Sequence, residues 1–343
     1  MTQLAEILLE RPPHPFWTVL RQVGIEYAVG VLPRHFTDWR EANADRPWDY
    51  VPLALYRDHV EAAGLRLAVI EDNPPMDRLR LGLPGRDEEL EAVLTLIRSM
   101  GRLGIPVWCY NWMPVVGWVR TTLSARGRGG AIVSAYDHAQ MSAAPPTWAG
   151  TVEAETLWEN LRWFLERACP VAEEAGVTLA LHPDDPPLDA PIRGIARIMS
   201  SVEAFERAME LHDSPANALT LCQGNFTLMT DELPGAIRRL GPKIAFAHFR
   251  DVRGTPEHFV ETFHDDGPTD MLACMRAYRD IGFDGVLRSD HVPTVEGDQA
   301  EVAGYSHHAR LHAIGYLAGL REAVEAEARV QSDDGASPST VTS

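Results

Sequence analysis

Short apolar segments typical of buried parallel strands recur along this chain, and helical stretches separate most of them. A strongly amphipathic example of such a helix spans residues 152–175. No glycine-rich nucleotide-binding turn follows any of the strands, so an open nucleotide-binding sheet loses support. The alternation therefore predicts a single (β/α)8 TIM barrel. The eight expected strands are residues 26–32, 65–71, 107–111, 177–182, 218–222, 244–248, 258–261 and 285–290.

The predicted barrel covers residues 1–328 as one catalytic domain. Within it, residues 1–15 are expected to form a proline-rich lead-in. Residues 113–151 are rich in Gly, Ala, Ser and Pro and are expected to form a long irregular connection. The Ser-, Asp- and Thr-rich stretch 329–343 is predicted to be a disordered tail.

Charge and cysteine content exclude several classes of partner. The formal net charge is -18, with no basic cluster to offset it, which argues against nucleic acids and anionic membranes. The four cysteines are scattered without close pairs, and the N-terminus lacks a basic start and a long apolar core. These features predict a cytoplasmic protein that acts on a small molecule and has no membrane partner.

Four expected strands end on a residue that can bind a metal. His182 ends the segment that starts at Val177, and Cys222, His248 and Asp290 end three later ones. In a barrel, the carboxyl ends of the strands meet at one mouth. Two imidazoles, a thiolate and a carboxylate suffice to hold a divalent transition metal. Each residue alone is more simply a packed cysteine or a loop residue, but the recurrence of the pattern favours a metal site.

Further polar residues lie at or beyond the same strand ends. His291 and Tyr305 offer an imidazole and a phenol as proton carriers. The remaining candidates would bind the substrate, three of them through guanidinium groups suited to a carboxylate, although salt bridging is the commoner role of arginine. These candidates are Arg120, Arg250, Arg288, Asn111 and Glu71.

Several of these residues lie in strings that resemble the mannonate dehydratases, a family of xylose-isomerase-like TIM barrels. The most specific string is His182-Pro-Asp-Asp-Pro-Pro187. Others are Cys109-Tyr-Asn-Trp-Met-Pro114, Leu221-Cys-Gln-Gly224 and Arg288-Ser-Asp-His291. They occur in order between about residue 20 and residue 325. This chain departs from the family pattern after Asp290, where Asp-His-Gly-His becomes Asp-His-Val-Pro293.

The resemblance implies an Mn²⁺-dependent hydro-lyase that converts D-mannonate, or a related aldonate, to 2-keto-3-deoxy-D-gluconate and water in hexuronate catabolism. It implies His182, Cys222, His248 and Asp290 as metal ligands, with His291 and Tyr305 as the acid/base pair. It also implies a homodimer or a larger homo-oligomer. The thiolate itself favours softer ions, so Fe²⁺, Co²⁺ and Zn²⁺ stay open beside Mn²⁺.

Three other functions compete with the dehydratase. A metal-dependent sugar isomerase or epimerase would share the proton abstraction but keep the hydroxyl. A sugar or metal sensor would need no proton carriers, which His291 and Tyr305 provide. A metal hydrolase is less compatible with a thiolate ligand. The arginines favour a carboxylate substrate and hence the dehydratase.

Overall fold

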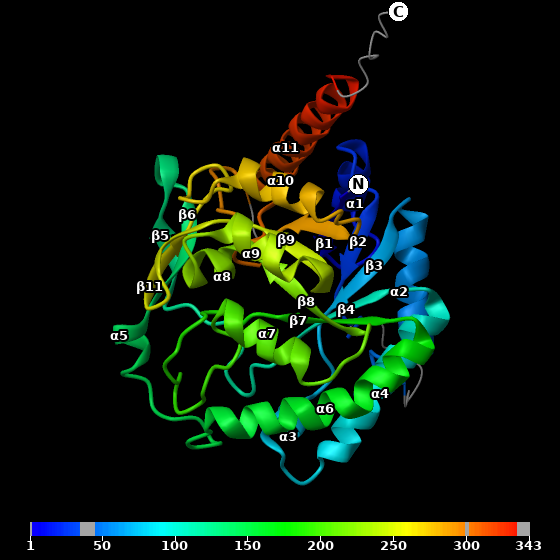
Figure 1. The fold of residues 1–343 in the computed structure, drawn as a ribbon, viewed down its shortest axis with the longest axis vertical. Coiled ribbons are helices and arrows are strands. Elements are labelled where there is room, and N and C mark those ends of the chain that lie inside the picture. The colour runs from blue at the N-terminus through cyan, green and yellow to red at the C-terminus, as the bar shows by residue number, and fades with distance from the viewer. Residues whose placement is uncertain (1, 35–44, 299–301, 335–343) are drawn as a thin grey trace, which may run out of the picture.

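The computed structural model describes residues 2–34, 45–298 and 302–334, and eight parallel strands form a closed barrel at its centre (Figure 1). Each strand pairs with its neighbours along the sequence of barrel strands, and the last strand pairs with the first. This architecture confirms the predicted single (β/α)8 barrel. The strands are β1 (Gln3–Leu8), β2 (Tyr27–Gly30), β3 (Arg66–Glu71), β4 (Val107–Asn111), β7 (Thr178–His182), β8 (Asn217–Cys222), β9 (Ile244–Phe249) and β12 (Val286–Ser289).

Helices follow the strands and surround the barrel (Figure 1). The principal ones are α1 (Pro15–Gln22), α2 (Tyr50–Ala62), α4 (Arg86–Leu103), α6 (Ala154–Ala175), α7 (Val202–Glu210), α9 (Leu233–Leu240), α10 (Met271–Asp280) and α11 (His307–Asp334). Shorter helices are α3 (Asp77–Leu81), α5 (His138–Met141), α8 (Gln223–Met229), and the 3₁₀ turns Arg128–Gly130 and Gly241–Lys243. Helix α11 extends past the predicted domain boundary at residue 328, and residues 335–343 of the predicted tail lie outside the described residues.

The first barrel strand lies in the segment that the sequence analysis assigned to a lead-in, and that prediction is wrong. Strand β1 pairs in parallel with both β2 and β12 and closes the barrel. Ala5 and Ile7 point into the barrel, where they pack in its small apolar interior. Glu6 alternates with them and is buried on the opposite side, where it pairs with Arg310 of α11. The sequence did not predict β1 because Glu6 interrupts its apolar pattern, and the arginine that neutralises Glu6 lies 304 residues away.

The segment predicted as the seventh barrel strand belongs to a second sheet, which is another correction. This four-stranded antiparallel sheet has the order β10-β11-β6-β5 and lies at one side of the barrel (Figure 1). Its strands β5 (Thr122–Arg126) and β6 (Ile132–Asp137) come from the connection predicted to be irregular. Strands β10 (Val252–Thr255) and β11 (His258–Glu261) follow β9. The second sheet thus adds a wall beside the barrel mouth.

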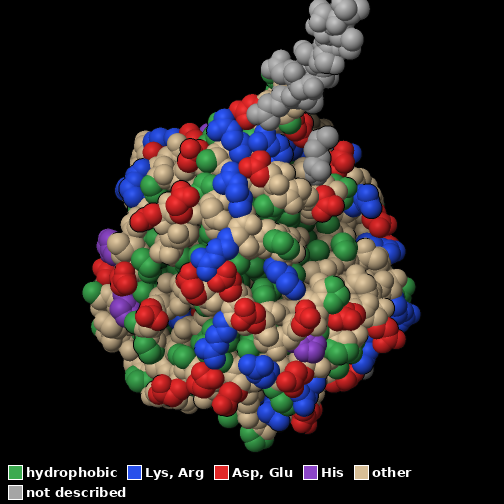
Figure 2. All heavy atoms as spheres, in the orientation of Figure 1, with side chains coloured by type: hydrophobic (Ala, Val, Ile, Leu, Met, Phe, Trp, Pro, Cys, Tyr) green, Lys and Arg blue, Asp and Glu red, His purple; other side chains and the backbone are tan. Residues whose placement is uncertain are grey.

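Most of the apolar core lies between the barrel and its helices, where alternate strand residues such as Leu4, Leu8 and Leu67 pack against helical side chains. On the face shown in Figure 2, acidic and basic side chains are interspersed and neither forms one large patch. Among the described residues, no helix is both long and apolar enough to cross a membrane.

Candidate metal centre and active site

The register of the barrel brings the predicted site residues to one level at the carboxyl ends of the strands. Asn111 of β4 lies opposite His182 of β7, and Cys222 of β8 lies opposite His248 of β9. His248 in turn pairs with Arg288 of β12. The proline after His182 denies the backbone an N–H, which is one reason why β7 stops there. Residues far apart in sequence therefore surround one mouth.

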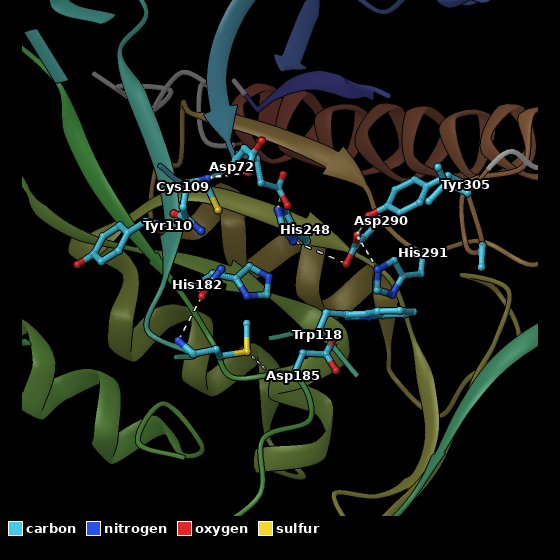
Figure 3. Close-up of a pocket in the computed structure, with 16 residues that line it drawn as sticks. Asp72, Cys109, Tyr110, Trp118, His182, Asp185, His248, Asp290, His291 and Tyr305 are labelled. Atoms are coloured by element: carbon cyan, nitrogen blue, oxygen red, sulfur yellow. Dashed lines mark hydrogen bonds and ion pairs between the residues drawn. The ribbon is translucent and has the colours of Figure 1, made fainter. Parts of the chain in front are cut away.

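Three of the four predicted metal ligands form a compact group. One ligand atom from each of His182, Cys222 and His248 lies within 4.8 Å of the others. Asp290 adjoins them, because its Oδ2 is 3.5 Å from the Cys222 Sγ and 3.7 Å from the His248 Nδ1. In Figure 3, His182 and His248 lie next to each other, with ring centroids 5.0 Å apart and the rings tilted by 46°. The ligand role of these four residues stays a prediction, but their donor atoms are the kinds that bind a transition metal.

Two histidine environments fit a bound cation. The ring of His248 is buried, with Nε2 3.3 Å from Glu71 Oε2 and Nδ1 3.7 Å from Asp290 Oδ2, and neither contact has the geometry of an ordinary hydrogen bond. Such unsatisfied buried nitrogens are rare unless an ion or water binds them. In His182, Nδ1 lies 2.7 Å from the Pro183 carbonyl oxygen, to which it donates when it carries the proton. That contact leaves Nε2 of His182 free to bind a metal.

A second group, Glu71, Cys109 and His248, also has ligand atoms within 4.8 Å of one another. It suits an ion less well. Both carboxylate oxygens of Glu71 accept hydrogen bonds from Arg288, at 2.8 and 2.9 Å. Burial and the neighbouring Glu71 raise the pKa of Cys109 well above its usual value, which keeps its thiol protonated. The group that contains Cys222 is therefore the better candidate for the predicted metal site.

Asp290 lies among cationic groups. Arg250 Nε is 2.7 Å from its Oδ2, and Arg288 Nη1 is 3.0 Å from its Oδ1. Burial by itself raises the pKa of Asp290, but the neighbouring His291, Arg288, His248 and Arg250 side chains together hold that pKa well below its usual value. Gly224, in the string after Cys222, leaves space for this arrangement, since a Cβ there would lie 2.5 Å from Arg250 Nη1.

The two predicted proton carriers lie beside Asp290 (Figure 3). The Tyr305 hydroxyl donates to Asp290 Oδ1 at 3.0 Å, and His291 Nε2 lies 3.8 Å from the same oxygen. Burial, together with the Asp290 carboxylate, raises the pKa of Tyr305 well above its usual value, so its phenol stays protonated. The edge-on ring of Trp118 packs against His291, with ring centroids 5.5 Å apart.

The three arginines predicted to bind substrate all face protein carboxylates. Arg120 contacts Asp185 and Glu261, each at 2.5 Å, and its side chain is fully buried. Arg250 contacts these same two carboxylates as well as Asp290, and Arg288 is paired with Glu71. Burial alone raises the pKa of Glu71, yet Arg288 and His248 lower it to about 2. Substrate binding by these arginines stays a prediction, and the geometry gives them a role in holding the acidic groups of the site.

The candidate site opens into a cavity of about 320 Å³. This is near the lower end of the size range of small-molecule sites, roughly 300–1,000 Å³. Of the predicted residues, His182, His248, Asp290, His291, Tyr305, Asn111 and Glu71 line it, whereas Cys222 and the three arginines do not. Asn111 Oδ1 accepts hydrogen bonds from Arg80 and from the Met113 N–H, so its position is fixed.

Two acidic residues of the site, Glu261 and Asp185, were not predicted from the sequence. Glu261 was seen only as the end of a weak strand, yet its Oε1 lies 3.0 Å from His291 Nδ1. Asp185 belongs to the string after His182 but received no role there, and its carboxylate bridges Arg120 and Arg250. The sequence pointed to Glu261 only through its position as a carboxylate at the end of a predicted strand. Its place beside His291 depends on the position of the second sheet, which the sequence did not reveal.

Comparison with known proteins identifies the family. A family model described as D-mannonate dehydratase (UxuA) matches residues 18–149 and 147–331. The chain belongs to the mannonate dehydratase family. The mannonate dehydratase of Thermotoga neapolitana is 34% identical over 343 residues, covering 89% of this chain and 92% of the relative. That of Enterococcus faecalis is 33% identical and covers 82% of this chain and 87% of its own length. The family predicted from the sequence is thus confirmed.

Solved structures agree with this assignment. The crystal structure of mannonate dehydratase from Streptococcus suis serotype2 has a TM-score of 0.86 and 31% identity, and covers 99% of this chain and 97% of that one. An L-ribulose 3-epimerase has a TM-score of 0.60 at 14% identity, with 97% of this chain and 98% of that chain covered. The second likeness shows a shared fold alone, so it gives the isomerase or epimerase alternative no support beyond the barrel.

Proposed function

We propose that this chain is a metal-dependent hydro-lyase that removes water from D-mannonate, or from a closely related aldonate, to give 2-keto-3-deoxy-D-gluconate. The observation that carries the proposal is one cavity lined by His182, His248 and Asp290 together with two proton carriers, in a member of the mannonate dehydratase family. Cys222 lies directly behind this lining, with its sulfur within 4.8 Å of a ring nitrogen of each histidine. The isomerase or epimerase alternative accounts for the metal group and the barrel, but not for the family.

The reaction needs three things from the protein. The proton at C2, next to the substrate carboxylate, has to be removed; the C3 hydroxyl has to leave with a proton as water; and the resulting enol has to become the ketone. His182, Cys222, His248 and Asp290 would hold the divalent cation. When bound, that cation stabilises the negative charge that develops on the substrate carboxylate and adjacent oxygen atoms. We propose Mn²⁺ as the ion, although the Cys222 thiolate also suits Fe²⁺, Co²⁺ and Zn²⁺.

The chain's own residues would perform the proton transfers. His291 and Tyr305 lie on either side of the Asp290 Oδ1 atom and both line the cavity. One of them would take the C2 proton and the other would protonate the departing C3 hydroxyl, so that one proton is removed and one is supplied. Trp118 covers His291 at the rim, which would limit the access of water to the reacting atoms.

We also propose a cytoplasmic location, a role in hexuronate catabolism and a homo-oligomeric state. The location is supported by the four cysteines, all buried and free, as expected in a reducing compartment. The catabolic role and the assembly rest on the family resemblance.

A metal and substrate screen tests the proposed function. The purified protein is stripped of metal, reloaded separately with Mn²⁺, Fe²⁺, Co²⁺ or Zn²⁺, and incubated with D-mannonate and other aldonates. We expect 2-keto-3-deoxy product only after reloading. The Cys222→Ser variant should lose both bound metal and turnover, whereas Cys274→Ala, which changes a buried cysteine in α10, should lose neither. Exchange of a substrate proton with solvent without release of water would favour an isomerase or epimerase instead.

A further inference from the structure

The second sheet delivers a carboxylate into the candidate site. Glu261 is the last residue of β11, outside the barrel, and only 3% of it is exposed. Its Oε1 lies 3.0 Å from Nδ1 of His291, which follows barrel strand β12. The pair therefore joins two parts of the fold that are 30 residues apart in sequence. Among the described residues, Glu261 is the only carboxylate that contacts His291 Nδ1 within 4.0 Å.

Two arginines fix the Glu261 carboxylate in place. Arg120 Nη2 lies 2.5 Å from its Oε1, and Arg250 Nη1 lies 3.1 Å from its Oε2. Arg250 also contacts Asp290, so one guanidinium ties the partner of His291 to a predicted metal ligand. Burial alone raises the pKa of Glu261, but Arg250, His291 and Arg120 hold that pKa far below its usual value. Glu261 is therefore a rigidly held, ionised hydrogen-bond acceptor.

We propose that Glu261 is the positioning residue for His291, and that the second sheet exists in part to supply it. This inference rests on the proposed function. An ionised carboxylate only accepts hydrogen bonds, so it requires a hydrogen on the Nδ1 atom and holds the ring in one orientation. Nε2 then points toward Asp290 Oδ1 and the cavity, where it can exchange a proton with the substrate. The rings of Trp118 and Tyr305 pack against that of His291 and limit its movement.

Two substitutions test the role of Glu261. Glu261→Gln removes its charge, and Glu261→Asp keeps the charge near the arginines but withdraws it from His291. In each, we expect kcat for D-mannonate to fall about 10- to 100-fold, the usual cost of losing such an orienting partner, with KM and bound metal near the wild-type values. The control is Asp265→Asn, which breaks an exposed pair with Arg128 and should leave kcat unchanged. If Glu261→Gln does not fold, the kcat of Glu261→Asp alone tests the role of Glu261.

A double-mutant cycle with His291→Asn separates positioning from a general structural role. If Glu261 acts through His291, its substitution should cost almost no further activity in the His291→Asn background. Equal fold-losses in the two backgrounds, wild-type kcat in both Glu261 variants, or loss of metal from both would overturn the inference. A failure of the proposed function looks different, because the metal-loaded wild-type protein itself would then form no dehydrated product.

Discussion

Tyr305→Phe isolates the proposed proton transfer, because it removes one hydroxyl and keeps the ring. The ring would still pack edge-on against His291, with centroids 5.4 Å apart. The hydroxyl donates a hydrogen bond at 3.0 Å to Asp290, and a bond to a charged group contributes about 1.5–3 kcal/mol to folding. Asp290 keeps its contacts with Arg250 and Arg288, so the substitution should lower the free energy of unfolding by an amount near the lower end of this range. Proton transfer by a positioned side chain accelerates reactions about 10²- to 10⁴-fold, which corresponds to about 2.7–5.4 kcal/mol of the activation barrier.

The assay measures kcat and KM for D-mannonate, bound metal and thermal unfolding for Tyr305→Phe and for Tyr136→Phe. The control removes a comparable hydroxyl, which bonds to His138 at 3.0 Å beside the second sheet and does not line the cavity. We expect Tyr305→Phe to lose about 10²- to 10⁴-fold in kcat while KM and metal content change little, and Tyr136→Phe to retain its activity. A Tyr305→Phe variant with full metal and kcat within about two-fold of the wild type would refute the role of Tyr305 in proton transfer.

Two further predictions concern stability. Arg310→Met leaves the buried carboxylates of Glu6 and Glu10 without their shared guanidinium, so it should lower the free energy of unfolding by about 3–5 kcal/mol, measured by urea denaturation. The control is Arg128→Met, which removes an exposed ion pair and should lower the free energy of unfolding by less than about 1 kcal/mol. Similar losses in both variants would contradict the prediction. Burial lowers the pKa of His264 from 6.5 in the unfolded chain to about 4, so the folded state favours the neutral imidazole. Protonation therefore destabilises the fold, and the free energy of unfolding should fall by about 3 kcal/mol as the pH drops from 6.5 toward 4. Unfolding measured across this range should show a weaker pH dependence in His264→Gln, and an unchanged slope would refute the assigned shift.

Much of the fold was readable from the sequence because its signals are local. Seven of the eight barrel strands are apolar segments whose own residues favour a buried strand. The exception was β1, where Glu6 breaks the apolar pattern. Glu6 can be buried because Arg310 neutralises its charge, and no local sequence pattern shows that these two residues meet. Similarly, β5 and β6 are only half-buried or exposed at many positions, so they lack the apolar signature of barrel strands.

By itself, the sequence determined the barrel and the residues that end its strands. The apolar residues before His182 and the prolines after it predict that this histidine ends a strand. Only the tertiary structure decided which charges meet. The guanidinium groups of Arg120 and Arg250, which the sequence marks only as candidates for substrate binding, hold Asp185 and Glu261 in the folded chain. The physical reason is that a buried charge needs a nearby counterion, and the chain supplies that counterion from a distant element whose position depends on the packing of the whole fold.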